Sequence, residues 1–253
     1  MGLFLCAASA WAQAPAAEET RAMIETSRHT ALAYSQSLPD FVCTQLVHRF
    51  VDTTRRGLWR VLDNLSIKLS YFEQMEDHKL VTVDGKPTGK LYSDLDGAVT
   101  VGEFGSVLRQ IFDPASRAVF TWEKWGKFNK RSTAVFLYRV DMSNSTYSLA
   151  FRVPMGLNRA KVAYSGIVEV DRETGDVLHL TYAAEGIPKS YPIQLAKTTV
   201  KYGFADVGGK EYLLPVASET EMRSRDLWAR NSVEFREYRK YSADSTISFG
   251  DGK

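Results

Sequence analysis

Hydrophobic positions along this chain change their spacing once, close to residue 40. Before that point, small and apolar residues recur every three or four positions, at Met23, Ser27, Ala31, Tyr34 and Leu38. This is the spacing of a helix that buries one face. Glu18 and Glu19 suit the positive N-terminal end of such a helix, and Pro39 cannot continue it. The pattern therefore predicts a leading helix that lays one stripe against a sheet.

From Phe41 onward, apolar and polar residues alternate, which is typical of strands with one buried face. In residues 65–71, for example, Leu, Ile, Leu and Tyr alternate with Ser, Lys and Ser. Segments of this kind predict about ten strands in mainly sequential order. They begin at Phe41 and continue through residues 65–71, 80–83, 119–122, 134–140, 147–153, 166–170, 177–182, 198–204, 212–214 and 232–241. Residues 84–86 predict a tight hairpin turn, and residues 171–176 predict a hairpin with a longer loop.

A second helical stripe interrupts the strands. Its apolar residues are Phe104, Val107, Leu108 and Ile111. The predicted helix begins at residues 102–103 and ends at the Asp-Pro pair at 113–114. Glycine and proline make residues 156–160 and 185–192 the predicted mobile loops.

The last predicted strand has a break in its alternation. Val233 and Phe235 alternate, whereas Tyr238 and Tyr241 fall out of phase. A β-bulge near Arg236 would restore the register. A helical turn that carries the aromatic residues on one side is the alternative.

These elements predict an α+β protein that is mainly β. About ten antiparallel strands rarely stay flat, because their twist accumulates until the sheet curls or closes. We therefore expect a strongly curved antiparallel sheet, an incomplete β-barrel, with the two helices on its concave side. If the helices fill that side only partly, the remaining space is an apolar pocket.

The first fourteen residues have neither the helical nor the alternating pattern of the rest of the chain. Residues 3–8 are apolar and uncharged, and the small-residue patterns that follow allow cleavage after Ala12 or Ala14. We interpret residues 1–14 as a signal peptide and residues 15–253 as a single curved-sheet domain. The protein is then exported, to the periplasm or the medium. No basic residue precedes Arg21, so an apolar segment packed into the core is the alternative.

Composition narrows the class of protein. Apolar residues make up 44% of the chain and the net charge is +2, which predicts a globular core without the basic field of a nucleic-acid-binding protein. No stretch is long and uncharged enough for a membrane span. Loss of residues 1–14 would leave Cys43 alone, and its apolar neighbours predict a buried thiol.

The sequence offers no catalytic, metal-binding or cofactor-binding signature. The histidines His29, His48, His78 and His179 do not pair at helical spacing. Cys43 and His48 lie five residues apart, so on one strand they point to opposite faces. The charged group at residues 73–78 is interpreted as a solvated turn. Aromatic residues among lysines at 120–131 are interpreted as a strand that packs the core, with a rim that contacts lipid as the alternative.

Several short phrases resemble a known superfamily. They are Trp59 with the strand at 65–71, residues 81–86, the hairpin at 166–177 and residues 212–215. With the leading helix, they are similar to the LolA/LolB lipoprotein-carrier superfamily of exported bacterial proteins. Residues 38–45 and 102–106 also resemble a group of exported proteins of unassigned activity. The superfamily resemblance implies an incomplete β-barrel whose helices form a lid over an apolar cavity.

On this basis we expect a non-catalytic, monomeric protein that binds a lipid, acyl chain or acylated protein in the cavity. No cofactor, metal or nucleic acid is expected. The residues expected to line or gate the pocket are Met23, Tyr34, Phe104, Leu108, Ile111, Leu69, Tyr71 and Phe151. The loop around Pro188 is expected to take part in gating. Two alternatives are a structural or interaction module of the cell envelope with a filled barrel, and a hydrolase.

Overall fold

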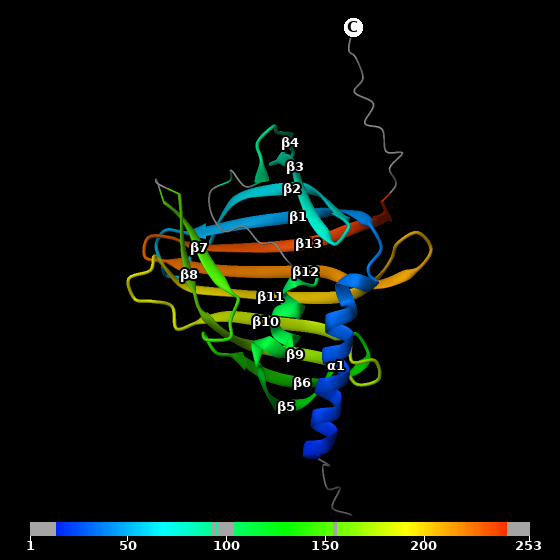
Figure 1. The fold of residues 1–253 in the computed structure, drawn as a ribbon. Helices are drawn as coiled ribbons and strands as arrows, with labels where there is room; N and C mark the ends of the chain where they lie inside the picture. The colour runs from blue at the N-terminus through cyan, green and yellow to red at the C-terminus, as the bar shows by residue number, and fades with distance from the viewer. Residues whose placement is uncertain (1–13, 93–94, 96–103, 154–155, 242–253) are drawn as a thin grey trace, which may run out of the picture.

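The computed structural model describes residues 14–92, 95, 104–153 and 156–241. Within them, eleven strands form one antiparallel sheet (Figure 1). These strands are β1 (Phe41–Asp52), β2 (Arg60–Phe72), β3 (Met75–Val83), β4 (Lys86–Pro87), β5 (Val119–Phe128), β6 (Arg131–Val140), β9 (Ala163–Asp171), β10 (Val177–Glu185), β11 (Ile193–Asp206), β12 (Glu211–Ser224) and β13 (Trp228–Lys240).

The strand order is β4-β3-β2-β1-β13-β12-β11-β10-β9-β6-β5. Most neighbours follow one another in sequence, but the last strand, β13, pairs with the first, β1. Strands β4 and β5 are the two ends of this order, so the sheet curls without closing. The predicted fold class, an incomplete antiparallel barrel with helices on its concave side, is therefore confirmed.

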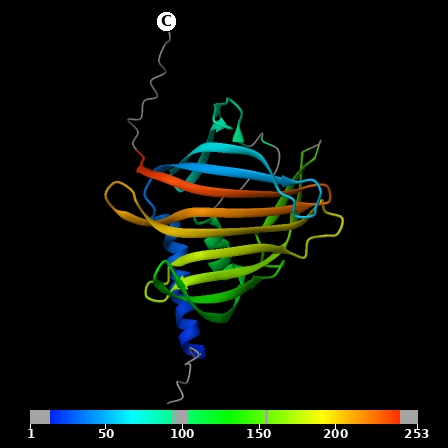
Figure 2. The same cartoon turned by 180° about the vertical axis from the view of Figure 1, so that it is seen from behind.

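Both helices lie on the concave side of the sheet, in front of the strands in Figure 1. Figure 2 shows the convex face, where the strands lie in front of the helices. Helix α1 (Ala17–Ser37) ends at Ser37. Pro39 disfavours helical backbone at Leu38, the residue before it, and Leu38 is extended. The predicted leading helix is confirmed, with acidic residues in its first turn.

Helix α2 (Ser106–Phe112) is shorter than its apolar stripe predicted. Gly105 caps it with φ of 114°, a left-handed conformation, so Phe104 lies in the turn ahead of the helix. The prediction that Phe104 is helical was therefore wrong. The predicted opening at residues 102–103 lies outside the described residues. The stop is confirmed: Asp113 caps a short 3-10 turn, η2 (Pro114–Ser116).

A separate hairpin contains β7 (Ser148–Val153) and β8 (Gly156–Lys161). The prediction of a loop at residues 156–160 was wrong, because this stretch pairs with β7 along its length, with Phe151 opposite Asn158. Glycine and asparagine disfavour strands locally, but pairing with a partner strand overrides that preference. The hairpin lies across one end of the main strands (Figure 1).

The predicted turn and bulge are both present. Asp84 and Gly85 take positive φ, as a tight hairpin requires, and Val83 pairs with Lys86. In β13 the register changes: Thr44 lies opposite Arg236, whereas Val42 lies opposite Arg239. The extra residue on β13 is a β-bulge, so the bulge interpretation is confirmed and the helical turn is wrong.

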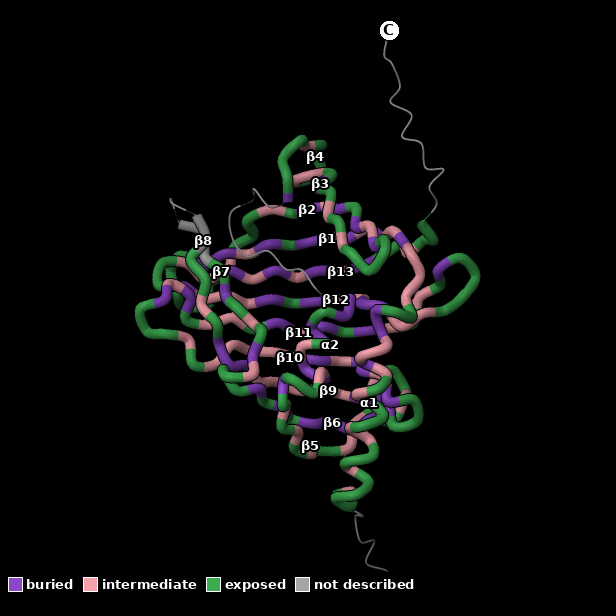
Figure 3. The backbone as a smooth tube through the Cα atoms, in the orientation of Figure 1, coloured by how far each residue is buried: buried purple, intermediate pink, exposed green. Residues whose placement is uncertain are grey.

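Burial alternates along the strands, as Figure 3 shows by purple and pink segments. In β1 the buried positions include Phe41, Cys43, Gln45 and Val47, and the residues between them are more exposed. Buried positions of neighbouring strands lie side by side because the strands pair in register. The core therefore lies on the concave face, in part beneath the two helices.

Gly166 marks a close approach between β9 and β10. A Cβ atom built there would lie 1.8 Å from the carbonyl oxygen of Thr181. That oxygen also accepts a hydrogen bond from the hydroxyl of Tyr138, which spans from β6. The strand therefore requires glycine at this position, since any side chain would push the two backbones apart.

We expect Gly166→Ala to lower the free energy of unfolding by about 1–3 kcal/mol, the usual cost of overpacking. Urea denaturation measures this change. Gly89→Ala is the matched control, because a Cβ at Gly89 meets nothing within 4 Å and its φ is ordinary. Equal stability of the two variants would contradict the close approach.

Candidate functional site

The concave face carries two large apolar clusters. The first, here called the helix cluster, packs α1 and α2 against β6, β9, β10 and β11. The second, here called the Phe104 cluster, joins Phe104 to side chains of β1, β2 and β13. A third, smaller cluster fastens the β7–β8 hairpin through Leu149 and Tyr191. The loop around Pro188 lies beside this third cluster, which Ile187 contacts.

The structure divides the residues predicted from the sequence between the two large clusters. Tyr34, Leu108 and Ile111 belong to the helix cluster, and Met23 packs against it. The Phe104 cluster contains Leu69, Tyr71 and Phe104. Phe151 lies in β7, and its side chain is not among the described ones. At the end of α1, the Tyr71 hydroxyl donates to the carbonyl oxygen of Ser35, the residue after Tyr34.

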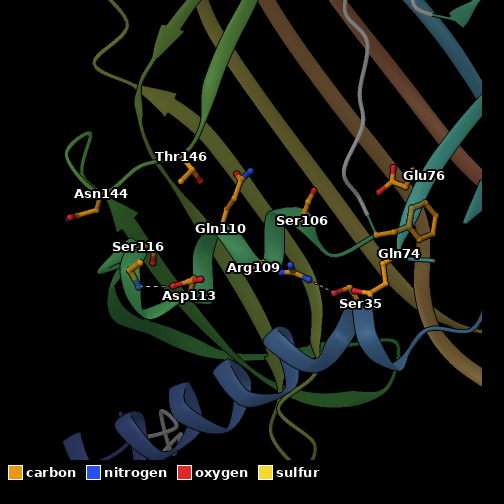
Figure 4. Close-up of a pocket in the computed structure, with 12 residues that line it drawn as sticks. Ser35, Gln74, Glu76, Ser106, Arg109, Gln110, Asp113, Ser116, Asn144 and Thr146 are labelled. Carbon is orange, nitrogen blue, oxygen red and sulfur yellow. Dashed lines mark hydrogen bonds between the residues drawn. The ribbon is translucent and has the colours of Figure 1, made fainter. Parts of the chain in front are cut away.

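A cavity of about 530 Å³ lies beside α2 (Figure 4). Its walls come from the end of α1, the β2–β3 hairpin, α2 and the segment between β6 and β7. Polar side chains form most of these walls, including Ser35, Glu76, Arg109 and Gln110. Of the residues predicted from the sequence, Phe104 lines this cavity.

Helix α2 separates the cavity from the helix cluster. Its buried side chains are Val107, Leu108, Ile111 and Phe112. Ser106, Arg109 and Gln110 instead line the cavity. The apolar stripe that the sequence revealed thus fills the concave face, and the polar side of the same helix forms a wall of the open space.

Three contacts fix α2 in place. The Arg109 guanidinium donates to the Ser35 hydroxyl at 2.7 Å, and Arg28 of α1 donates to the carbonyl oxygen of Phe112 at 2.7 Å. From the sheet, the Tyr164 hydroxyl donates to the carbonyl oxygen of Gln110. A Cβ at Gly105 would lie 3.0 Å from the Ser35 Cβ, so the two helices touch closely here. Helix α2 is therefore held by α1 as much as by the sheet.

Phe104 lies at the boundary between the cavity and the apolar interior. Its ring packs against Phe41, Tyr71 and Phe235, with centroids 5.2, 6.0 and 5.5 Å away. The residue is 2% exposed, although it also lines the cavity. Phe104 therefore covers the apolar floor made by β1, β2 and β13.

Gln45 is a buried residue that the sequence reasoning missed. It is 0% exposed, and neither its amide nitrogen nor its amide oxygen has a hydrogen-bond partner. Its neighbours across the sheet are Ile67 on β2 and Phe235 on β13, both apolar. Leaving a buried amide unpaired costs about 1–3 kcal/mol. The alternation of β1 was the signal that could have placed this glutamine on the inner face.

Burial favours the uncharged forms of Tyr34, Tyr71 and His78. Burial raises the pKa of Tyr34 well above its ordinary value and also raises the pKa of Tyr71, so both phenols remain hydrogen-bond donors. Burial also lowers the pKa of His78, whose Nε2 lies 3.8 Å from a Glu76 carboxylate oxygen. In the described residues, no three histidine, cysteine or acidic side chains are grouped to hold a metal ion.

No protein-family model matches the sequence, and no curated protein matches it. Among solved structures, the chain is similar to a putative outer-membrane lipoprotein-sorting protein domain from Vibrio parahaemolyticus. The two are 11% identical, with a TM-score of 0.38 over 87% of this chain and 92% of that chain.

Two further structures are similar over most of their length. A LolA superfamily protein from Nitrosomonas europaea is 8% identical, with a TM-score of 0.33 over 88% of this chain and 93% of that chain. A DUF1329 family protein from Desulfovibrio piger is 9% identical, with a TM-score of 0.38 over 88% of this chain and 95% of that chain. These are likenesses of fold at 8–11% identity, and membership of the LolA superfamily stays a prediction.

Cys43 is a buried member of the Phe104 cluster, so the reactivity of its thiol measures whether that cluster opens. The thiol is 3% exposed, as predicted, and burial raises its pKa to about 12. At pH 8 only about one thiol in ten thousand is then the reactive thiolate. We expect Cys43 to resist alkylation in the native protein and to react fully in urea, measured by peptide mapping that distinguishes it from Cys6. Rapid native labelling of Cys43 would show that the cluster opens.

Proposed function

We propose that this chain is a non-catalytic binding protein that holds a lipid or an acyl chain on the concave side of its open barrel. The observation that carries the proposal is the cavity of about 530 Å³ beside α2, with Phe104 in its wall. Its size lies within the range of small-molecule sites. The ligand enters there and takes the place of the Phe104 ring over the apolar floor.

The two sides of this boundary suit the two parts of an amphiphile. Arg109 and Glu76 offer charged groups at the cavity, where a polar head remains hydrated. Beneath Phe104, the floor of Phe41, Tyr71 and Phe235 offers aromatic surface to a hydrocarbon chain. Burial of a chain there gains roughly 25 cal/mol for each Å² of apolar surface removed from water.

Helix α2 supports a gating role. It spans seven residues and has no side-chain cap at its N-terminus. Helices this short owe their stability to packing, so α2 depends on the contacts that fasten it. The bond between Arg109 and Ser35 and the turn at Gly105 join Phe104 to α1. We propose that movement of this junction uncovers the apolar floor.

A structural or interaction module remains the second candidate. The observation that favours it is the filling of the concave face by both helices: Tyr34, Leu108 and Ile111 are all buried in the helix cluster. A barrel filled in this way works through its outer surface. The two candidates differ in whether the Phe104 cluster accepts a ligand.

The remaining predictions concern the state of the protein in the cell. No helix in the described residues is both long enough and apolar enough to cross a membrane. Export with removal of residues 1–14, a single domain over residues 15–253 and a monomeric state stay predictions. The partner proposed is a lipid or an acylated protein.

Native mass spectrometry of the full-length product purified from its own cells tests the proposal. We expect an added mass that denaturation releases as a lipid or acyl chain. Gln110→Trp should reduce this retained mass severalfold, because indole fills space at the cavity wall. Gln194→Trp is the matched control, since Gln194 is exposed on β11 and does not line the cavity. Retention of no lipid by any of these proteins would favour the filled module.

Replacement of Phe104 tests its covering role. We expect Phe104→Ala to increase the fluorescence of an added acyl-chain probe, because the apolar floor becomes accessible, and to lower the free energy of unfolding by about 3–5 kcal/mol. Phe136→Ala is the matched control: Phe136 is equally buried but belongs to the helix cluster. It should lose comparable stability without gaining probe fluorescence. Equal gains in both variants would indicate general loosening.

A further inference from the structure

Gln45 is a polar side chain surrounded by apolar ones. On β1 its same-face neighbours are Cys43 and Val47, and across the sheet it faces Ile67 and Phe235. All four belong to the Phe104 cluster. A leucine or methionine has nearly the volume of glutamine and would leave no amide unpaired. The fold alone therefore gives no reason for an amide at this position.

Aromatic contacts connect Gln45 to the cavity. Phe235, directly opposite Gln45 in the β1–β13 pair, packs edge-on against Phe104 with ring centroids 5.5 Å apart. Phe104 in turn lines the cavity. A chain that displaces the Phe104 ring therefore comes to lie against Phe235, next to the unpaired amide.

We propose that Gln45 is a specificity-determining residue that hydrogen-bonds the carbonyl group of an ester- or amide-linked acyl chain. The inference rests on the proposed function. The Gln45 Nε2–H group donates to the carbonyl oxygen, and Oε1 accepts from the N–H group when the linkage is an amide. A plain hydrocarbon chain leaves the glutamine unpaired, so the site discriminates against it.

The neutral character of this neighbourhood favours a carbonyl over a charged group. Along the inner face of β1, the next charged side chain is Arg49, which already pairs with Asp63 through two contacts of 2.6 and 2.5 Å. A charged head group beside Gln45 would lose its hydration without a counter-ion. The charged part of the ligand therefore stays at the cavity, near Arg109.

Two ligands that differ only in the carbonyl test the assignment. 1-Hexadecanoylglycerol carries an ester, and 1-O-hexadecylglycerol carries an ether in its place. Each is titrated against the full-length protein by displacement of a fluorescent fatty-acid probe. We expect the ester to bind about tenfold more tightly, the effect of one added neutral hydrogen bond.

Gln45→Leu should weaken ester binding to the level of the ether and leave ether binding unchanged. The same variant should raise the unfolding midpoint of the ligand-free protein, because no buried amide remains unpaired. Gln194→Leu, on the exposed side of β11, is the matched control and should change neither result. If Gln45→Leu does not fold, Gln45→Met replaces it, and the comparison of ester with ether in the unmodified protein decides.

The outcomes separate the two proposals. Equal binding of ester and ether by the unmodified protein would overturn the role of Gln45 and leave the proposed function standing. Preference for the ester that survives in Gln45→Leu or Gln45→Met would also overturn that role. Binding of neither ligand, with no displacement of the probe, would overturn the proposed function itself.

Discussion

The structure depends on covering the concave face of an open sheet. Eleven strands curl without closing, so their inner face would expose a wide apolar surface to water if nothing packed against it. The two helices cover one part of that face, and Phe104 covers another. Tyr34 of α1 and Ile111 of α2 are buried against the strands. The sheet therefore holds its shape only together with the helices, and anything that binds inside competes with their side chains.

This competition is centred where the two helices meet. Gly105 allows the chain to turn in a left-handed conformation against Ser35, and Phe104, immediately before it, covers the floor of the second cluster. Arg109 ties the same helix to Ser35 from the cavity side. A few adjacent contacts thus link the polar cavity, the apolar floor and the buried amide of Gln45. The proposed binding site is this junction.

Local pattern was sufficient for much of the fold. The spacing of Ala31 and Tyr34 predicted α1, and Asp84-Gly85 predicted a hairpin. Prediction failed where strand pairing or a capping residue outweighs the preference of individual residues. Residues 156–160 contain glycine and asparagine, yet they form β8 because β7 lies beside them. Phe104 has helical spacing, but the capping residue Gly105 excludes it from α2. Apolar spacing records neither strand pairing nor the backbone conformation of a capping glycine.

Local spacing and strand twist were enough to predict the period of most elements, the buried character of Cys43 and the curled antiparallel class. What the buried side chains enclose depends on how the elements pack together. The tertiary structure put Leu108 and Ile111 on the buried side of α2, opened a polar cavity on the other side of that helix and left Gln45 unpaired. The reason is physical: a pattern shows that a side chain is buried, but the contacts that bury it come from residues far apart in the chain.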